Sequence, residues 1–151
     1  MRRQKELASE TCPVARSLEV IGDRWSLLIV RDAFDGIRRF SEYQRNLGLS
    51  KSVLASRLHE LVKEGVLKVI PGENGSAYQA YELTEKGRGL FHIIVGLRQW
   101  GESFLFSRNE AHSVMIERSS GKPVGKLTLR TKAGRVLVPE DVAVNKVVDP
   151  T

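Results

Sequence analysis

The stretch that decides the fold reads FSEYQRNLGL-SKSVLASRLHELVKEG over residues 40–65, followed by two β-like runs at residues 66–70 and 78–83. A short helix, a tight turn, a longer helix and a hairpin follow one another in this order. That order predicts a winged helix-turn-helix, in which the second helix can lie in the major groove of DNA and the hairpin can reach the flanking backbone. The expected fold class is therefore α+β, mainly α.

Local signals mark the ends of the two motif helices. Ser41, followed three residues later by Gln44, fits a capping box that opens the first helix. Gly48 supplies the positive φ that a tight turn between helices needs. Ser50 then caps the second helix, whose expected buried stripe consists of Leu54, Leu58 and Leu61.

The segments before the motif are read as a tail and two helices. Residues 1–11 are polar and predict a flexible N-terminus. Pro13 suits the first turn of a helix that stops at Gly22, and Asp23 can cap the next helix.

The segments after the hairpin are expected to form one helix and a small β-rich part. Thr84 caps a long helix that should run to about Phe106 and serve in dimerisation. Residues 12–106 would then form one DNA-binding and dimerisation domain. Three short apolar runs with glycines at the turns predict a small β-rich C-terminal extension over residues 107–151, with strands at 114–117, 126–130 and 136–138.

Bulk composition places the chain among globular proteins. Of its 151 residues, 41% are hydrophobic, which is enough for a core. No apolar run approaches the roughly 20 residues of a membrane span, and no signal peptide is recognisable, so we expect a cytoplasmic protein without a membrane partner. The single cysteine excludes an intrachain disulfide framework and a cysteine-based zinc site.

The charge of the chain favours a polyanionic partner. The formal net charge is +6. Between Gly36 and His59, Glu42 alone opposes five cations, which are Arg38, Arg39, Arg45, Lys51 and Arg57. A locally basic helix-turn-helix is typical of a protein that binds double-stranded DNA, although a solvated basic face is the simpler alternative.

The candidate DNA-contacting residues come from the second motif helix, the segment before the first, and the wing. The outer helix face can meet base edges and thymine methyl groups, and the N-terminus of that helix favours a phosphate. Arg57 could instead pair with Glu60 or Glu64, and the wing could be a passive hairpin. The full set is Arg38, Arg39, Ser41, Ser50, Lys51, Ser52, Ala55, Ser56, Arg57, His59, Lys68, Asn74 and Tyr78.

An ordered set of short motifs between residues 12 and 105 resembles the HxlR family of bacterial winged-helix transcriptional regulators. The motifs are CP (12–13), IGDRW (21–25), RFSE (39–42), LS (49–50), GVL (65–67) and YELTEKG (81–87). The resemblance implies a homodimer that binds a roughly palindromic operator and controls nearby genes. The wing holds fewer arginines than is usual in that family, and the cysteine pair that some members carry after the last helix is missing.

The long helix is the expected dimer interface. Its apolar stripe is too broad to be covered by one small winged-helix core, and a second copy of the chain is the simplest cover. The first helix is expected to pack against it across the interface. The candidate interface residues are Val14, Leu18, Leu90, Ile94, Leu97, Trp100 and Phe104.

Cys12 is the one redox candidate. It precedes Pro13 at a helix N-terminus, where the helix dipole can stabilise a thiolate, and some HxlR relatives sense oxidants through a cysteine at this place. The favoured reading is nevertheless a buried, inert thiol. A small-molecule effector could bind between the dimer helix and the N-terminal helices, but no residue specifies one.

The pattern gives no support for an enzyme. Serine, histidine and aspartate occur in no recognisable nucleophile setting, and His59, His92 and His112 lack metal-ligand spacing. We therefore expect no catalytic residue, no metal and no cofactor. The competing readings are a winged-helix protein-interaction module without specific DNA recognition, and a ligand or redox sensor whose output is DNA binding.

Overall fold

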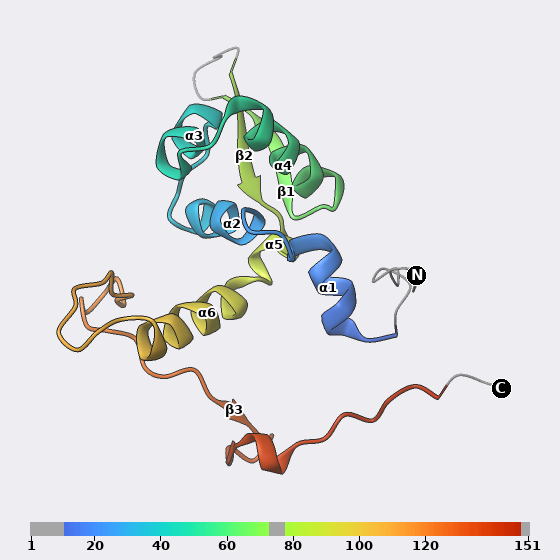
Figure 1. Ribbon diagram of the computed structural model, residues 1–151, viewed down its shortest axis with the longest axis vertical. Coiled ribbons are helices and arrows are strands. Elements are labelled where there is room, and N and C mark those ends of the chain that lie inside the picture. The colour runs from blue at the N-terminus through green and yellow to red at the C-terminus, as the bar shows by residue number, and fades with distance from the viewer. Residues whose placement is uncertain (1–10, 73–77, 149–151) are drawn as a thin grey trace. The chain divides into compact units, whose positions relative to one another are not determined.

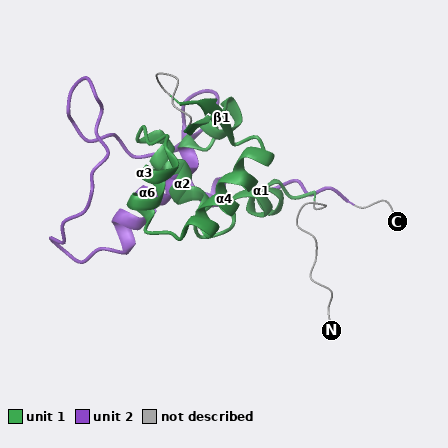
Figure 2. Ribbon diagram, turned by 90° about the horizontal axis from the view of Figure 1, so that it is seen from above, with its two compact units in different colours: residues 1–91 green, residues 92–151 purple. Residues whose placement is uncertain are grey.

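The computed structural model describes residues 11–72 and 78–148 and confirms a mainly helical winged helix-turn-helix (Figure 1). It forms two compact units, one up to Phe91 and one from His92 onward, which are coloured separately in Figure 2. The elements of the first unit are α1 (Pro13–Ile21), α2 (Ser26–Phe34), α3 (Phe40–Leu47), α4 (Lys51–Lys63), β1 (Leu67–Pro71), β2 (Gln79–Leu83) and α5 (Glu85–Arg88). Those that follow are α6 (Phe91–Phe104), β3 (Leu129–Arg130), β4 (Val136–Leu137) and the 3₁₀ turn η3 (Pro139–Asp141).

The turn between α3 and α4 forms as its sequence predicts. Gly48 has a φ of 66°, and its N–H bonds the carbonyl of Gln44 at the end of α3. The Ser50 hydroxyl then accepts the N–H of Val53 at 3.3 Å and caps α4. Both signals are local, so neighbouring residues were enough to predict them.

The predicted capping box of Ser41 and Gln44 is wrong. Helix α3 begins at Phe40, its N-cap is Arg39 in an extended conformation, and no side chain caps it. Arg39 forms an isolated β-bridge with Ala80, and the N–H of Tyr81 donates to the Arg38 carbonyl at 2.8 Å. This pairing with the wing holds residue 39 extended, so the helix begins directly after it.

The wing is an antiparallel pair of β1 and β2, with Leu67 opposite Leu83 and Lys68 opposite Glu82. Its strands begin one residue later than the predicted runs. Because the segment before α3 bridges to β2, the wing is fastened to the helix-turn-helix by backbone hydrogen bonds as well as by side chains.

The expectation of one helix from Thr84 to Phe106 is wrong, because the segment forms α5 and α6 with a break at Gly89 and Leu90. Thr84 does act as a cap: its hydroxyl accepts the N–H of Gly87 and donates to the carbonyl of Gly65. A Cβ on Gly87 would lie 2.1 Å from the Val66 carbonyl oxygen, so α5 approaches β1 as only glycine allows. This tight docking and two glycines of low helix propensity end the helix early.

The core of the first unit gathers side chains from α2, α3, α4 and β1. Its most deeply buried apolar members are Ile29, Val30, Tyr43, Leu54, Leu58, Leu61, Val66 and Leu67. Asp23 caps the start of α2 as expected, because its carboxylate accepts the N–H groups of Trp25 and Ser26 at 2.8 and 2.9 Å. The two motif helices are therefore held on a packed scaffold.

The second unit has little regular structure after α6. The predicted strand at 114–117 is reduced to one bridge between Ile116 and Pro123, and β3 and β4 pair over two residues each. Within residues 107–148 no residue is buried. Among the described helices, none has the length and apolar character to span a membrane.

Candidate nucleic-acid interface

Helix α4 has one buried and one exposed face. Leu54, Leu58 and Leu61 are buried in the core, which confirms the predicted stripe. The candidate base-contacting residues on the other side are all exposed, and they are Ser52, Ala55, Ser56 and His59. A helix held this way presents small polar groups and a methyl group outward, as contact with base edges in a major groove requires.

A hollow of about 610 Å³ lies beside the start of α4 and brings together candidates that are distant in sequence. It is lined by Arg39, Phe40, Ser41, Gln44, Lys51, Tyr78, Gln79 and Tyr81. Two of these carry positive charge and none carries a carboxylate. The capped N-terminus of α4 adds backbone N–H groups beside Lys51, so the hollow suits a phosphate group.

Two other predicted phosphate contacts are tied to an acid that sequence reasoning missed. The Glu82 carboxylate pairs with Arg38 at 2.6 Å and with Lys68 at 3.0 Å. The hydrogen bond from Lys68, and then the contact with Arg38, lower the pKa of Glu82. The cross-strand pairing of Lys68 with Glu82 was the signal that could have found this ion cluster. A phosphate at these cations would compete with Glu82.

Arg57 is held by α2's cap and not by its own helix. Its guanidinium lies 3.6 Å from the Asp23 carboxylate, so its ion partner is neither Glu60 nor Glu64. Burial raises the pKa of Asp23, but hydrogen bonds from Ser26 and Trp25 and the charge of Arg57 outweigh this, and the pKa is lowered overall. Asp23 therefore stays ionised and links the start of α2 to α4.

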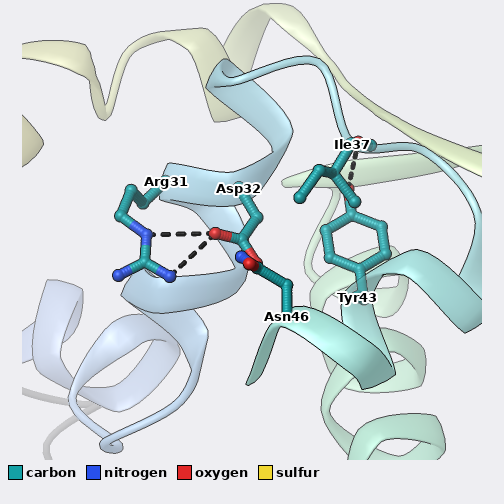
Figure 3. Close-up of polar contacts among 5 residues, drawn as sticks. All are labelled: Arg31, Asp32, Ile37, Tyr43 and Asn46. Carbon is teal, nitrogen blue, oxygen red and sulfur yellow. Dashed lines mark hydrogen bonds and ion pairs between the residues drawn. The ribbon is translucent and has the colours of Figure 1, made fainter. Parts of the chain in front are cut away.

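A buried polar network positions α3 (Figure 3). The Asp32 carboxylate accepts two hydrogen bonds from the Arg31 guanidinium, at 2.8 and 3.0 Å, and one from the Asn46 side-chain amide at 2.8 Å. Asp32 is 1% exposed and Asn46 is exposed, so the bond joins α2 to α3 from a buried acceptor to a donor at the surface. The bond between Asn46 and Asp32 was not predicted from the sequence. The acid Asp32 within the apolar helix Ser26–Phe34 could have indicated that it needs a polar partner.

Tyr43 fixes the loop before α3 in the same region (Figure 3). Its hydroxyl donates to the Ile37 carbonyl at 2.8 Å. Burial, and next the charge of Asp32, raise the pKa of Tyr43. The hydroxyl therefore remains a donor, and it holds the loop that leads to Arg38 and Arg39.

The candidate dimer residues differ in exposure. Leu97, Trp100 and Phe104 on α6 are 51%, 57% and 72% exposed, and the rings of Trp100 and Phe104 pack with centroids 5.8 Å apart. Val14 and Leu18 on α1 are also exposed, Leu90 is half-buried, and Ile94 is buried. Most of the set is thus available to a partner, while Ile94 already packs within its own chain.

The expectation of a buried thiol is wrong, because Cys12 is exposed. It is the N-cap residue of α1, with an extended backbone, so its side chain lies at the open end of the helix. Candidate Asn74 lies outside the described residues. Within residues 11–72 and 78–148, no three His, Cys, Asp or Glu side chains are grouped to hold a metal ion.

Known proteins match this chain chiefly over the winged helix-turn-helix. The family model described as HxlR-like helix-turn-helix matches residues 20–109. The uncharacterized HTH-type transcriptional regulators Mb3122 of Mycobacterium bovis and Rv3095 of Mycobacterium tuberculosis are 48% identical over 92 residues. That match covers 61% of this chain and 58% of theirs, so the chain spans less than two thirds of the length of these relatives.

Solved structures extend the likeness. PA1607, described as a transcription factor, superposes with a TM-score of 0.90 at 50% identity, over 95% of this chain and 100% of that one. The protein PA1374 from Pseudomonas aeruginosa superposes with a TM-score of 0.64 at 33% identity, over 93% of this chain and 95% of that one. The redox regulator HypR in its oxidized form gives 0.56 at 32% identity, over 66% and 100%.

Proposed function

Because the chain belongs to the HxlR-like helix-turn-helix family, we propose that it is a transcriptional regulator that binds a palindromic DNA operator as a homodimer. The observation that carries the proposal is the basic hollow beside the exposed face of α4. Arg39, Ser41, Lys51 and Tyr78 reach it from separate parts of the chain, and the described residues that line it include no acid. An arrangement that combines a phosphate site with a helix face fits duplex DNA better than it fits an acidic protein surface.

In this proposal the two sets of residues have different tasks. Arg39 and Lys51 hold a backbone phosphate and set the position of the protein on the duplex. Ser52, Ala55 and Ser56 then face the base edges and select the sequence. No residue is assigned a catalytic task.

The dimer is proposed to form through the exposed apolar residues of α6. Leu97, Trp100 and Phe104 form an apolar surface that water covers in the single chain. A palindromic site would require the two copies of α4 in a two-fold dimer formed through this surface to lie about 34 Å apart, or a multiple of that distance.

We further propose that the thiol of Cys12 modulates DNA binding. Its exposure supports this, and the similar regulator HypR is known in an oxidized and a reduced form. Since the chain has one cysteine, a disulfide must join two chains or a small thiol. Two Cys12 thiols would give up two protons and two electrons to an oxidant such as diamide as the S–S bond forms.

The test is footprinting on the DNA upstream of the protein's own gene, with diamide present or absent. We expect a protected, roughly symmetric site without diamide, and weaker or stronger protection with it. The control variant Cys12→Ser should protect the DNA as the unoxidised protein does, and diamide should not change its protection. Protection of no site, together with capture of no duplex DNA at low salt, would favour the protein-interaction reading.

A further inference from the structure

The C-terminal segment 107–148, called the arm below, has many apolar side chains and no core to hold them. Within it, eleven large apolar residues are exposed, with fractions from 39% at Val124 to 87% at Val148. They are Val114, Ile116, Val124, Leu127, Leu129, Val136, Val138, Val142, Val144, Val147 and Val148. A soluble chain rarely leaves so many apolar side chains in water without a partner.

The first half of the arm is nevertheless hydrogen-bonded to α6 of its own chain. The Gln99 side-chain amide donates to the Gly125 carbonyl at 3.0 Å and accepts the N–H of Leu127 at 2.8 Å. Arg98 donates to the Ser113 carbonyl and hydroxyl at 3.1 and 2.8 Å. These bonds hold the backbone at residues 113, 125 and 127 beside α6. Val124 and Leu127 in the same stretch nevertheless remain 39% and 43% exposed.

The hairpin of β3 and β4 in the arm places its two leucines on the same face. Leu129 pairs with Leu137, so both lie on one face, whereas Arg130 pairs with Val136 on the other. Leu137 is half-buried while Leu129 is 62% exposed. The leucine face of the hairpin is thus apolar and only partly covered.

We infer that the arm docks on a second copy of this chain, against the exposed residues of the partner's α6, and that the two copies exchange arms reciprocally. This rests on the homodimer proposed above. Arm and α6 belong to one unit, yet each leaves an apolar surface open. In a two-fold dimer each open surface can cover the other one, and the exchange closes without leaving a free edge.

The exposed apolar area of the arm is large enough for an interface with a second copy of the chain. At about 30 Å² per carbon, the exposed parts of the eleven side chains offer roughly 600 Å². A standard interface takes about 800 Å² from each partner, and α6 supplies the remainder through Leu97, Trp100 and Phe104. The arm lies almost wholly beyond the family match, which ends at residue 109, so the exchange would be an addition to the winged helix-turn-helix.

DNA is the competing partner for the arm, because its hairpin carries Arg130, Lys132 and Arg135. Two of these cations are already engaged: Arg130 donates to the Gly134 carbonyl and Arg135 pairs with Asp141. The eleven apolar side chains, by contrast, each remain at least 39% exposed. A protein partner would therefore explain the exposed apolar side chains of the arm, which a polyanion such as DNA would not.

The first experiment compares Leu129→Glu with Thr128→Glu in the full chain by sedimentation equilibrium. Thr128 is exposed and directly precedes β3, so both variants gain one charge at the hairpin but only the first replaces a residue of the leucine face. We expect Leu129→Glu to weaken dimerisation about tenfold or more, as for a residue central to an interface, and Thr128→Glu to leave it unchanged. Equal dimerisation of wild type and Leu129→Glu would overturn the inference.

The second experiment asks which chain the arm touches. A benzophenone amino acid replaces Leu129, chains labelled with ¹⁴N and ¹⁵N are mixed and allowed to exchange, and cross-linked peptides are sequenced after irradiation. We expect mixed-isotope links to peptides of α6. Links within one isotope alone, or a change in DNA affinity for Leu129→Glu without a change in dimerisation, would overturn the inference while leaving the regulator intact. A wild-type monomer would overturn the homodimer and the inference together.

Discussion

The leucine side chains of α4 in the first unit are buried, whereas those in the arm of the second unit are exposed or half-buried. Leu54, Leu58 and Leu61 on α4 are 0–1% exposed, whereas Leu127 and Leu129 of the arm are 43% and 62% exposed. The helices and wing of the first unit enclose a packed core, although Val14 and Leu18 of α1 lie outside it and are exposed. In the second unit Ile94 and Val95 of α6 are buried, but no residue of the arm is buried.

This difference separates two kinds of function. The packed core of the first unit holds α4 rigidly, and the exposed face of α4 must keep its geometry when it enters a groove of DNA. The exposed apolar residues of the arm would contribute binding free energy only where a partner removes water from them.

Leucine truncation in each unit tests the comparison most strongly. Leu58→Ala should lower the free energy of unfolding by about 2–5 kcal/mol, because it leaves a cavity in a packed core. Leu129→Ala, measured at a concentration where the protein is monomeric, should change it by about 0.5 kcal/mol or less. Urea denaturation followed by circular dichroism measures both. Similar losses from the two substitutions would show that the arm has a core of its own.

A second test introduces charge on α6. The double variant Leu97→Glu, Phe104→Glu should remain helical, since both side chains are largely exposed in the single chain. It should weaken dimerisation by about a hundredfold, equivalent to about 2.8 kcal/mol, with a parallel loss of operator affinity. The exposed polar site Ser103→Glu is the matched control. Sedimentation equilibrium decides it: a double variant that dimerises like wild type places the interface elsewhere.

A third test separates the basic groups of the two units. Lys51→Ala or Arg39→Ala should weaken binding to all DNA sequences. Either should also reduce the slope of log affinity against log salt by about 0.9 for each phosphate that the variant no longer neutralises. Lys132→Ala in the arm removes an equal charge and should leave the slope unchanged. Fluorescence anisotropy over a salt series gives these slopes, and a reduced slope for Lys132→Ala would assign the arm to DNA.

The smallest expected effect concerns pH and the cap of α2. The pKa of Asp23 in the folded protein lies below its ordinary value of 3.8. Its stabilisation is therefore complete above about pH 5 and is lost as the pH falls through 3.8 and below. The difference in unfolding free energy between wild type and Asp23→Asn should shrink from pH 5 to pH 2. A constant difference across that range would mean that the charge of Asp23 does not contribute.

Prediction from sequence succeeded where a signal and its structural consequence lie within a few residues. The cap at Ser50, the left-handed Gly48 and the leucine stripe of α4 all depend on neighbours along one helix or turn. The candidate site was partly foreseeable in the same way. Lys51 and Tyr78 were each named for their own chemistry, but their meeting in one hollow depends on how the wing folds back.

Prediction failed where a distant segment decides the local outcome. The β-bridge from Arg39 to Ala80 moved the start of α3, and the approach of Gly87 to Val66 split the long helix. The bond from Asn46 to Asp32 was missed for the same reason. Cys12 was expected to be buried because single cysteines are commonly buried, but it is exposed at the N-terminal end of α1.

The sequence by itself therefore determined the order of elements, the caps of α4 and α5, the buried face of α4 and the family of the chain. These follow from periodicity and from short-range hydrogen bonding, which act over one or two helical turns. Only the tertiary structure decided the gathering of the basic hollow, the Glu82 ion cluster, the division into α5 and α6 and the open apolar surface of the arm. Each depends on which distant segments exclude water from one another, and composition and spacing along the chain do not specify that.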